Sequence, residues 1–292
     1  MTEIDPNTAF VFGCGYLGRR VAKRLLATGW HVSALTRSRE NAKALAGMGI
    51  VPILGDWTDR RVIQRIPAAR RVLFSVGYDG RGGHDRHTVY VEGLRNALFA
   101  VRPESSVVYV STTGVYHQGG NQWVDEASPT HPSREGGKAH LQAEELLWRR
   151  RPATASGRTV ALRMAGLYGP GRVPRMRSVA KGETIEADPQ SFLNLIHIED
   201  AADCVIAAWE VARAERLYAV SDGTPVRRGE FYAEIARQLG VVAPQLQGEA
   251  SGRSEGSKRI WNRRMRRDLL PRVAYSSYRE GLRALCSPGG KP

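Results

Sequence analysis

The chain has 292 residues, of which 42% are hydrophobic and 25% are charged, the balance of an ordinary globular protein with a substantial core. No apolar run approaches the ~18 residues that a membrane-spanning helix needs, and the opening MTEIDPNTAF lacks the pattern of a signal peptide. We therefore expect no membrane span and a cytoplasmic location. The few cysteines stand far apart without CxxC spacing, so we expect no disulfide framework and no metal site.

The positive charge of the chain raises the question of nucleic-acid binding. Lys and Arg number 43 against 29 Asp and Glu, and the densest basic cluster is RIWNRRMRRDLLPR at 259–272. A nucleic-acid reader is expected to show a recognised module or interleaved aromatic residues. We find neither pattern, so we predict a small-molecule substrate, polar or anionic, and no nucleic-acid partner. The sequence makes no prediction about the oligomeric state.

Strand-like and helix-like patterns alternate along the first half of the chain. Short apolar runs predict strands at 9–13, 31–36, 51–54, 70–76, 106–112 and 159–165. Apolar residues at helical spacing predict helices at 16–28, 40–46, 88–101 and 134–150. Beyond residue 165 the alternation is less regular, with a helix within 194–214, a strand at 216–222 and a helix at 228–239.

This alternation predicts an α/β fold. Strands that are continuous apolar runs are buried on both faces, which is typical of a parallel sheet with helices on both sides. We therefore expect a Rossmann-type doubly wound domain at 1–165. Residues 166–292 are expected to form mainly a small substrate-binding lobe, with a segment at about 192–222 returning to the sheet.

A glycine-rich turn follows the first predicted strand. In FVFGCGYLGRR, residues Gly13, Gly15 and Gly18 form G-x-G-x-x-G between an apolar strand and an amphipathic helix, the context that this motif requires. The glycines allow a tight turn, close approach of a pyrophosphate and close packing of helix on sheet. The helix N-terminus offers N–H groups to the phosphates, so we expect Tyr16 and Leu17 to contact the cofactor as well.

The end of the second predicted strand bears on the cofactor type. An acidic residue there would bind the ribose 2′-hydroxyl of NAD(H), but this chain has Thr36 and Arg37 instead. A guanidinium with neighbouring hydroxyls suits a 2′-phosphate. The sequence therefore favours NADP(H), with NAD(H) as the alternative.

Two further strand ends lie at the same edge of the predicted sheet. Asp56 and Trp57 follow the third strand, and Ser75 and Gly77 follow the fourth. Because carboxyl ends of parallel strands meet where a dinucleotide binds, we expect all four residues to line the cofactor site.

A set of motifs resembles a known superfamily when taken in order. They are GCGYLG, LGDWTD, VYVSTTGVY, GGKAHLQAEELL, LRMAGLYGPGR and NLIHIEDAADCV. Their order and spacing from Phe10 to Asp222 are similar to those of extended short-chain dehydrogenases/reductases, in the NAD(P)-dependent epimerase/dehydratase group. This group acts largely on nucleotide sugars, and the ordered set is more specific than any one motif.

The resemblance implies roles for individual residues. Asp56 would contact the adenine amino group, Thr112 would polarise the substrate, and Lys138 would hold the nicotinamide ribose. Three more residues would lie beside the nicotinamide and the substrate, namely Arg163, Tyr168 and Arg172.

One position departs from the family pattern. The family's general acid–base is a Tyr four residues before the Lys, and Arg134 occupies that position here. A guanidinium does not release a proton near neutral pH, so we predict that Arg134 binds an anionic substrate. The proton must then come from elsewhere, and the candidates are Tyr116, Tyr168 and Glu135. The chain therefore resembles the atypical members that lack the Tyr.

These observations favour an NAD(P)-dependent oxidoreductase or epimerase that acts on a sugar-like or nucleotide-sugar substrate. The alternative is a non-catalytic NADP(H)-binding sensor or regulatory protein. The missing Tyr favours the sensor, whereas the retention of Thr112 and Lys138 favours the enzyme.

Overall fold

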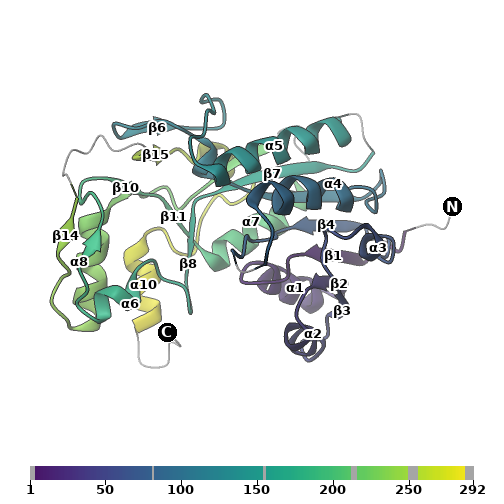
Figure 1. Cartoon of the computed structure of the whole chain (residues 1–292), viewed down its shortest axis with the longest axis horizontal. Helices are drawn as coiled ribbons and strands as arrows, with labels where there is room; N and C mark the ends of the chain where they lie inside the picture. The colour runs from purple at the N-terminus through teal and green to yellow at the C-terminus, as the bar shows by residue number, and fades with distance from the viewer. Residues whose placement is uncertain (1–3, 81, 154–155, 212–215, 249–255, 287–292) are drawn as a thin grey trace. The chain divides into compact units, whose positions relative to one another are not determined.

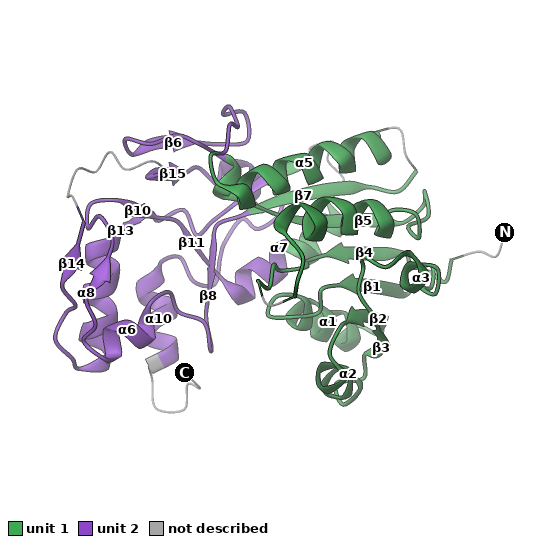
Figure 2. Cartoon of the chain, viewed as in Figure 1, with its two compact units in different colours: residues 1–115, 133–163, 205–217 green, residues 116–132, 164–204, 218–292 purple. Residues whose placement is uncertain are grey.

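The computed structural model describes residues 4–80, 82–153, 156–211, 216–248 and 256–286 (Figure 1). The chain forms two compact units, each assembled from separate segments (Figure 2). Unit 1 comprises residues 1–115, 133–163 and 205–217, and unit 2 comprises residues 116–132, 164–204 and 218–292.

The main sheet is parallel and has seven strands in the order β12-β7-β5-β4-β1-β2-β3. The strands are β1 (Thr8–Phe12), β2 (His31–Thr36), β3 (Val51–Leu54), β4 (Arg71–Phe74), β5 (Ser106–Thr112), β7 (Thr159–Met164) and β12 (Leu217–Val220). All six residues of β7 are buried, as expected for a strand covered on both faces. The predicted Rossmann-type α/β class is confirmed.

Helices flank this sheet, as Figure 1 shows. Those of unit 1 are α1 (Gly18–Ala27), α2 (Arg39–Ala46), α3 (Arg60–Ile63), α4 (Gly93–Ala97) and α5 (Glu135–Arg150), and α7 (Ile198–Glu210) runs from unit 2 into unit 1. The helix predicted at 88–101 is shorter and begins with a π-helical turn at Thr88–Glu92. That wider turn buries the three consecutive side chains of Val89, Tyr90 and Val91. A 3₁₀ turn at Thr113–Val115 follows β5.

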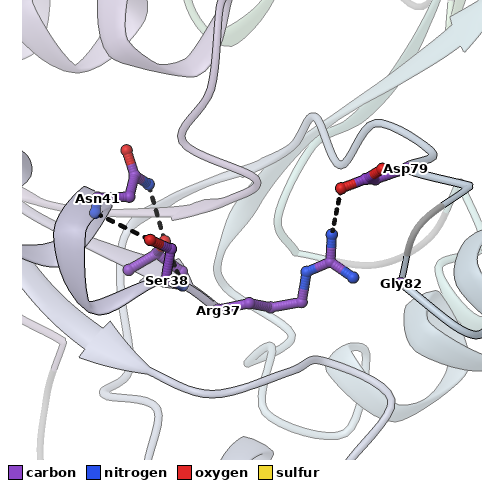
Figure 3. Close-up of a pocket in the computed structure, with 6 residues that line it drawn as sticks. Arg37, Ser38, Asn41, Asp79 and Gly82 are labelled. Atoms are coloured by element: carbon purple, nitrogen blue, oxygen red, sulfur yellow. Dashed lines mark hydrogen bonds and ion pairs between the residues drawn. The ribbon is translucent and has the colours of Figure 1, made fainter.

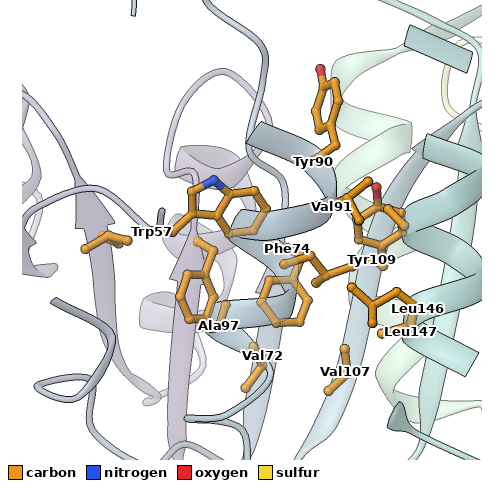
Figure 4. Packing of buried hydrophobic residues seen from close by; sticks show 14 of the residues in the cluster. Trp57, Val72, Phe74, Tyr90, Val91, Ala97, Val107, Tyr109, Leu146 and Leu147 are labelled. Carbon is orange, nitrogen blue, oxygen red and sulfur yellow. The ribbon is translucent and has the colours of Figure 1, made fainter. Parts of the chain in front are cut away.

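Several aromatic side chains pack within the core of unit 1, among them Trp57 and Phe74 (Figure 4). The rings of Phe12 and Phe74 stack with their centroids 4.8 Å apart, and Trp57 lies 6.1 Å from Phe12. The chain adds β2 and β3 on one side of β1 and then places β4 on the other side. The order in which strands are added to the sheet therefore changes direction between β1 and β4. In such sheets a ligand binds beyond the carboxyl ends of the strands at this point.

Unit 2 consists of short strands and helices. Its strands are β6 (Gln122–Val124), β8 (Gly166–Tyr168), β9 (Ile185–Glu186), β10 (Phe192–Leu193), β11 (Leu195–His197), β13 (Val226–Arg227), β14 (Leu246–Gln247) and β15 (Lys258–Ile260). They form the two-stranded pairs β10-β13, β11-β8, β14-β9 and β15-β6. Its helices are α6 (Met176–Ala180), α8 (Arg228–Leu239), α9 (Arg263–Asp268) and α10 (Tyr278–Cys286), with a core that includes Phe231 and Tyr278. Within the described ranges no helix has the length and apolarity to cross a membrane.

Candidate functional site

The glycine turn between β1 and α1 has two crowded positions and one open position. A Cβ atom at Gly13, which has φ +83°, would lie 2.5 Å from the Cα atom of Val76. A Cβ at Gly18 would lie 2.7 Å from the carbonyl oxygen of Gly13. A Cβ at Gly15 would have no neighbour within 4 Å. The turn thus leaves space at the position expected to face a pyrophosphate, and its residues fit that group.

Neighbouring residues hold the turn in place. The hydroxyl of Ser75 donates to the carbonyl oxygen of Gly13 at 3.0 Å, which ties the end of β4 to the turn. Leu17 is buried, and the Arg20 guanidinium lies 4.4 Å from the ring centroid of Tyr16. The thiol of Cys14 is buried, and burial raises its pKa to about 12, so it stays protonated near neutral pH.

A shallow pocket of about 450 Å³ lies where β2 ends (Figure 3). Its lining residues are Thr36, Arg37, Ser38, Asn41, Asp79 and Gly82. The Asn41 amide nitrogen donates to the Thr36 hydroxyl at 2.7 Å, and the Asn41 backbone N–H donates to the Ser38 side chain at 3.2 Å. Ser38 is therefore the N-cap of α2.

Arg37 lies between two carboxylates in this pocket. Its guanidinium is 3.7 Å from an oxygen of Asp56 and 3.8 Å from an oxygen of Asp79. Asp56 also accepts hydrogen bonds from the backbone N–H and the hydroxyl of Thr58, at 2.9 and 2.8 Å. The surroundings of Arg37 are thus more acidic than the sequence indicated.

Trp57 and Gly77 differ in their surroundings. The Trp57 side chain is 4% exposed, and its indole lies against Gly93, where a Cβ would be 2.3 Å from the ring nitrogen. This burial argues for a core role of that side chain instead of the predicted cofactor contact. Gly77 has open space around its Cα atom.

The start of α5 displays three exposed charged side chains. Arg134 is the N-cap with an extended backbone, and the amino group of Lys138 lies 2.8 Å from a carboxylate oxygen of Glu135. Within the described ranges, the Arg134 side chain has no hydrogen bond or ion pair. Glu135 thus places a negative charge at Lys138. The hydroxyl of Thr112 accepts a hydrogen bond from the N–H of Gly114 at 3.0 Å.

Arg163 is not exposed to a ligand. Its Nε and Nη2 donate to the two oxygens of Glu144 at 3.1 and 2.8 Å, and Ser111 donates to the same carboxylate at 2.5 Å. Arg163 and Glu144 are 5% and 2% exposed. The pair therefore ties α5 to β7, which argues against the predicted contact of Arg163 with the substrate.

Three predicted site residues belong to unit 2. Tyr116 and Tyr168 are buried, and burial raises the pKa of the Tyr168 hydroxyl. The Tyr168 ring leaves no room for a side chain at Gly281, where a Cβ would be 2.3 Å from its oxygen. Arg172 is exposed and forms an isolated bridge with Gly169. Burial of the two tyrosines argues against direct proton transfer to a substrate.

Several residues at the site were not predicted from the sequence. Asn41 and Asp79 line the pocket, and Arg19 donates a hydrogen bond from Nη2 to the Asn41 side-chain oxygen. The sequence position of Arg19, directly after the third glycine of the motif, could have indicated a place near the cofactor. The position of Asn41, three residues after the capping Ser38, could likewise have indicated the first turn of a helix. Asp79 stands in a loop without periodicity and gave no signal.

The sheet order, the open glycine turn and the pocket beyond β2 define a Rossmann-type dinucleotide-binding protein. The model of the NAD dependent epimerase/dehydratase family matches residues 9–220, and the chain belongs to this family.

Known proteins with similar sequences or structures agree with this assignment. Human short-chain dehydrogenase/reductase family 42E member 1 is 29% identical over 267 residues, which cover 80% of this chain and 67% of that protein. A solved structure from Methylobacillus flagellatus, described as an NAD-dependent epimerase/dehydratase, is 30% identical with a TM-score of 0.76, covering 96% of this chain and 98% of that one. MoeE5 in complex with UDP-glucose and NAD is 21% identical with a TM-score of 0.75, covering 94% and 96%, and shares the fold.

Proposed function

We propose that this protein is an NADP(H)-dependent oxidoreductase or epimerase that acts on an anionic sugar-like substrate, such as a nucleotide sugar. The observation that carries the proposal is the start of α5, where the exposed Arg134 precedes Lys138 by four residues in the unit that contains the glycine turn. The UDP-glucose bound to MoeE5 supports the substrate class. A cytoplasmic location is part of the proposal.

The cofactor would be held by residues of unit 1. The turn at Gly15 would hold the pyrophosphate, Asp56 the adenine and Lys138 the nicotinamide ribose. When bound, a nicotinamide dinucleotide supplies reversible hydride exchange with a substrate carbon. NAD(H) is the second candidate, because the carboxylates of Asp56 and Asp79 lie beside Arg37, and carboxylates suit an unphosphorylated ribose.

The chain's own residues would bind the substrate and move its proton. Arg134 would hold an anionic group through charged hydrogen bonds. Thr112 would donate a hydrogen bond to the reacting oxygen. Glu135 is the remaining proton-transfer candidate, since it is exposed and adjoins Lys138, and its carboxylate can accept a proton from a substrate hydroxyl.

The test combines cofactor titration with turnover. NADPH and NADH binding would be followed by nicotinamide fluorescence, and nucleotide sugars with and without a carboxylate would be screened for turnover by absorbance at the nicotinamide band. We expect tighter binding of NADPH and turnover that Glu135→Gln reduces by about 10²–10⁴-fold. Glu145→Gln, an exposed carboxylate of the same helix, is the matched control. Tight NADPH binding with no turnover of any substrate would favour the sensor instead.

A further inference from the structure

Arg19 lies in the first turn of α1, directly after the last glycine of the turn. Its Nη2 donates to the side-chain oxygen of Asn41, and its Nε is buried without a hydrogen-bond partner within the described residues. No carboxylate of those residues lies within ion-pair distance of its guanidinium. Arg19 thus has a charge without a counter-charge and a buried donor without an acceptor.

Asn41 fixes this arginine at the pocket beyond β2. Its amide nitrogen donates to the Thr36 hydroxyl at 2.7 Å, and its backbone N–H donates to the Ser38 hydroxyl. Both ends of the Asn41 amide are therefore engaged, with the oxygen toward Arg19 and the nitrogen toward Thr36. Asn41 lines the pocket (Figure 3), so its hydrogen bond with Arg19 places the Arg19 guanidinium next to a lining residue.

The two arginines near this pocket differ in electrostatic surroundings. Arg37 has two carboxylates within 4 Å, so the group of Arg37, Asp56 and Asp79 carries a net charge of about −1 and repels a phosphate. The charge of Arg19 acts on the glycine turn as well, where it lowers the pKa of Cys14 against the larger effect of burial. A phosphate at the pocket would be attracted by Arg19 more than by Arg37.

We propose that Arg19 recognises the 2′-phosphate of the cofactor and that Asn41 is its positioning residue. The inference rests on the proposed NADP(H) site and assigns to Arg19 the 2′-phosphate contact that was predicted for Arg37. A 2′-phosphate beside Arg19 would supply a counter-charge for its guanidinium.

The test uses two probes without a nicotinamide, adenosine 2′,5′-bisphosphate and adenosine 5′-diphosphate, in calorimetric titrations of the full chain. We expect the wild type to prefer the 2′-phosphorylated probe. Arg19→Ala should reduce that preference by about 10- to 100-fold, since a charged hydrogen bond is lost. Lys23→Ala removes the same charge one turn further along α1 and should leave the preference unchanged. Arg37→Ala should change it by less than threefold.

Asn41→Asp gives a second, independent test. An acidic residue in the first turn of a helix is favourable, so α2 should remain folded. The new carboxylate would pair with Arg19 and repel a phosphate, so the preference should fall at least tenfold while binding of adenosine 5′-diphosphate persists. The inference is overturned if Arg19→Ala leaves the preference intact, or if Arg37→Ala alone removes it. Equal affinity of the wild type for both probes would also overturn it. That result would be compatible with an NAD(H)-dependent enzyme.

Discussion

Gly13 and Gly15 stand two residues apart in one turn, but a substitution should affect them differently. Gly15→Val should leave the fold intact, because a Cβ there meets no protein atom within 4 Å, and should abolish NADPH binding by filling the phosphate space. Gly13→Ala should lower the melting temperature, because its Cβ would lie 2.5 Å from the Cα atom of Val76 at a φ of +83°.

The measurement for these variants is thermal unfolding by circular dichroism together with fluorescence titration of NADPH. A Gly15→Val variant that melts like the wild type and binds NADPH normally would show that the turn does not hold the cofactor. Gly29→Ala, at a positive φ of +82° with no atom near its Cβ, separates the strain of the backbone from the clash at Gly13.

Arg134 is the residue at which substrate binding and proton transfer can be distinguished. Arg134→Ala should raise KM about 10- to 100-fold and lower kcat less, because a charged hydrogen bond made in both ground and transition states is lost. Arg134→Tyr should weaken binding of the anionic substrate and create weak reductase activity toward simple carbonyls. Steady-state kinetics, or ligand titration without turnover, provides the measurement.

Arg149→Ala, at the exposed far end of the same helix, controls for the loss of charge. If Arg134→Ala abolished turnover and left ligand affinity unchanged, Arg134 would belong to the chemistry and the predicted binding role would be wrong.

At the scale of elements, one buried ion pair joins helix α5 to strand β7. Glu144→Ala should destabilise the protein by about 3–5 kcal/mol, because it leaves the Arg163 guanidinium buried without its counter-charge. Glu145→Ala removes a carboxylate at the next, exposed position and should change the free energy of unfolding by less than about 0.5 kcal/mol. Urea unfolding of both variants measures the difference, and equal midpoints would exclude a structural role for the pair.

The strands of the main sheet could be predicted because they are continuous apolar runs, and β2 and β3 have the predicted bounds. The strands β6 and β15 have three residues each, too few to establish a period, and they pair across 136 positions of sequence. The partner of Arg163 could have been found, since Glu144 lies among the apolar residues of the buried face of α5. Of the two acidic neighbours of Arg37, Asp56 was expected at the same edge of the sheet, whereas Asp79 could not be predicted because it lies in a loop without periodicity.

At the scale of the whole molecule, the stability of the chain should depend on pH through a buried carboxyl of unit 2. Burial raises the pKa of Asp222 to about 8, and the nearby charge of Asp200 adds to this effect. One Asp222 oxygen accepts a hydrogen bond from the N–H of Thr224 at 2.8 Å, whereas the other is buried without a partner in the described part of the chain. Folding therefore favours the protonated form of this carboxyl.

The sign of the pH effect follows from this raised pKa. Between about pH 4 and pH 8 the folded protein keeps a proton that the unfolded chain has lost, so the free energy of unfolding falls as the pH rises through this window. We expect the free energy of unfolding of the wild type to decrease by on the order of a few kcal/mol from pH 5 to pH 9, and its melting temperature to decrease with it. Asp222→Asn should flatten the curve and stabilise the protein most at pH 9, whereas Glu186→Gln, at an exposed position of β9, should not. Parallel curves for the wild type and Asp222→Asn would show that Asp222 does not hold a proton in the folded protein.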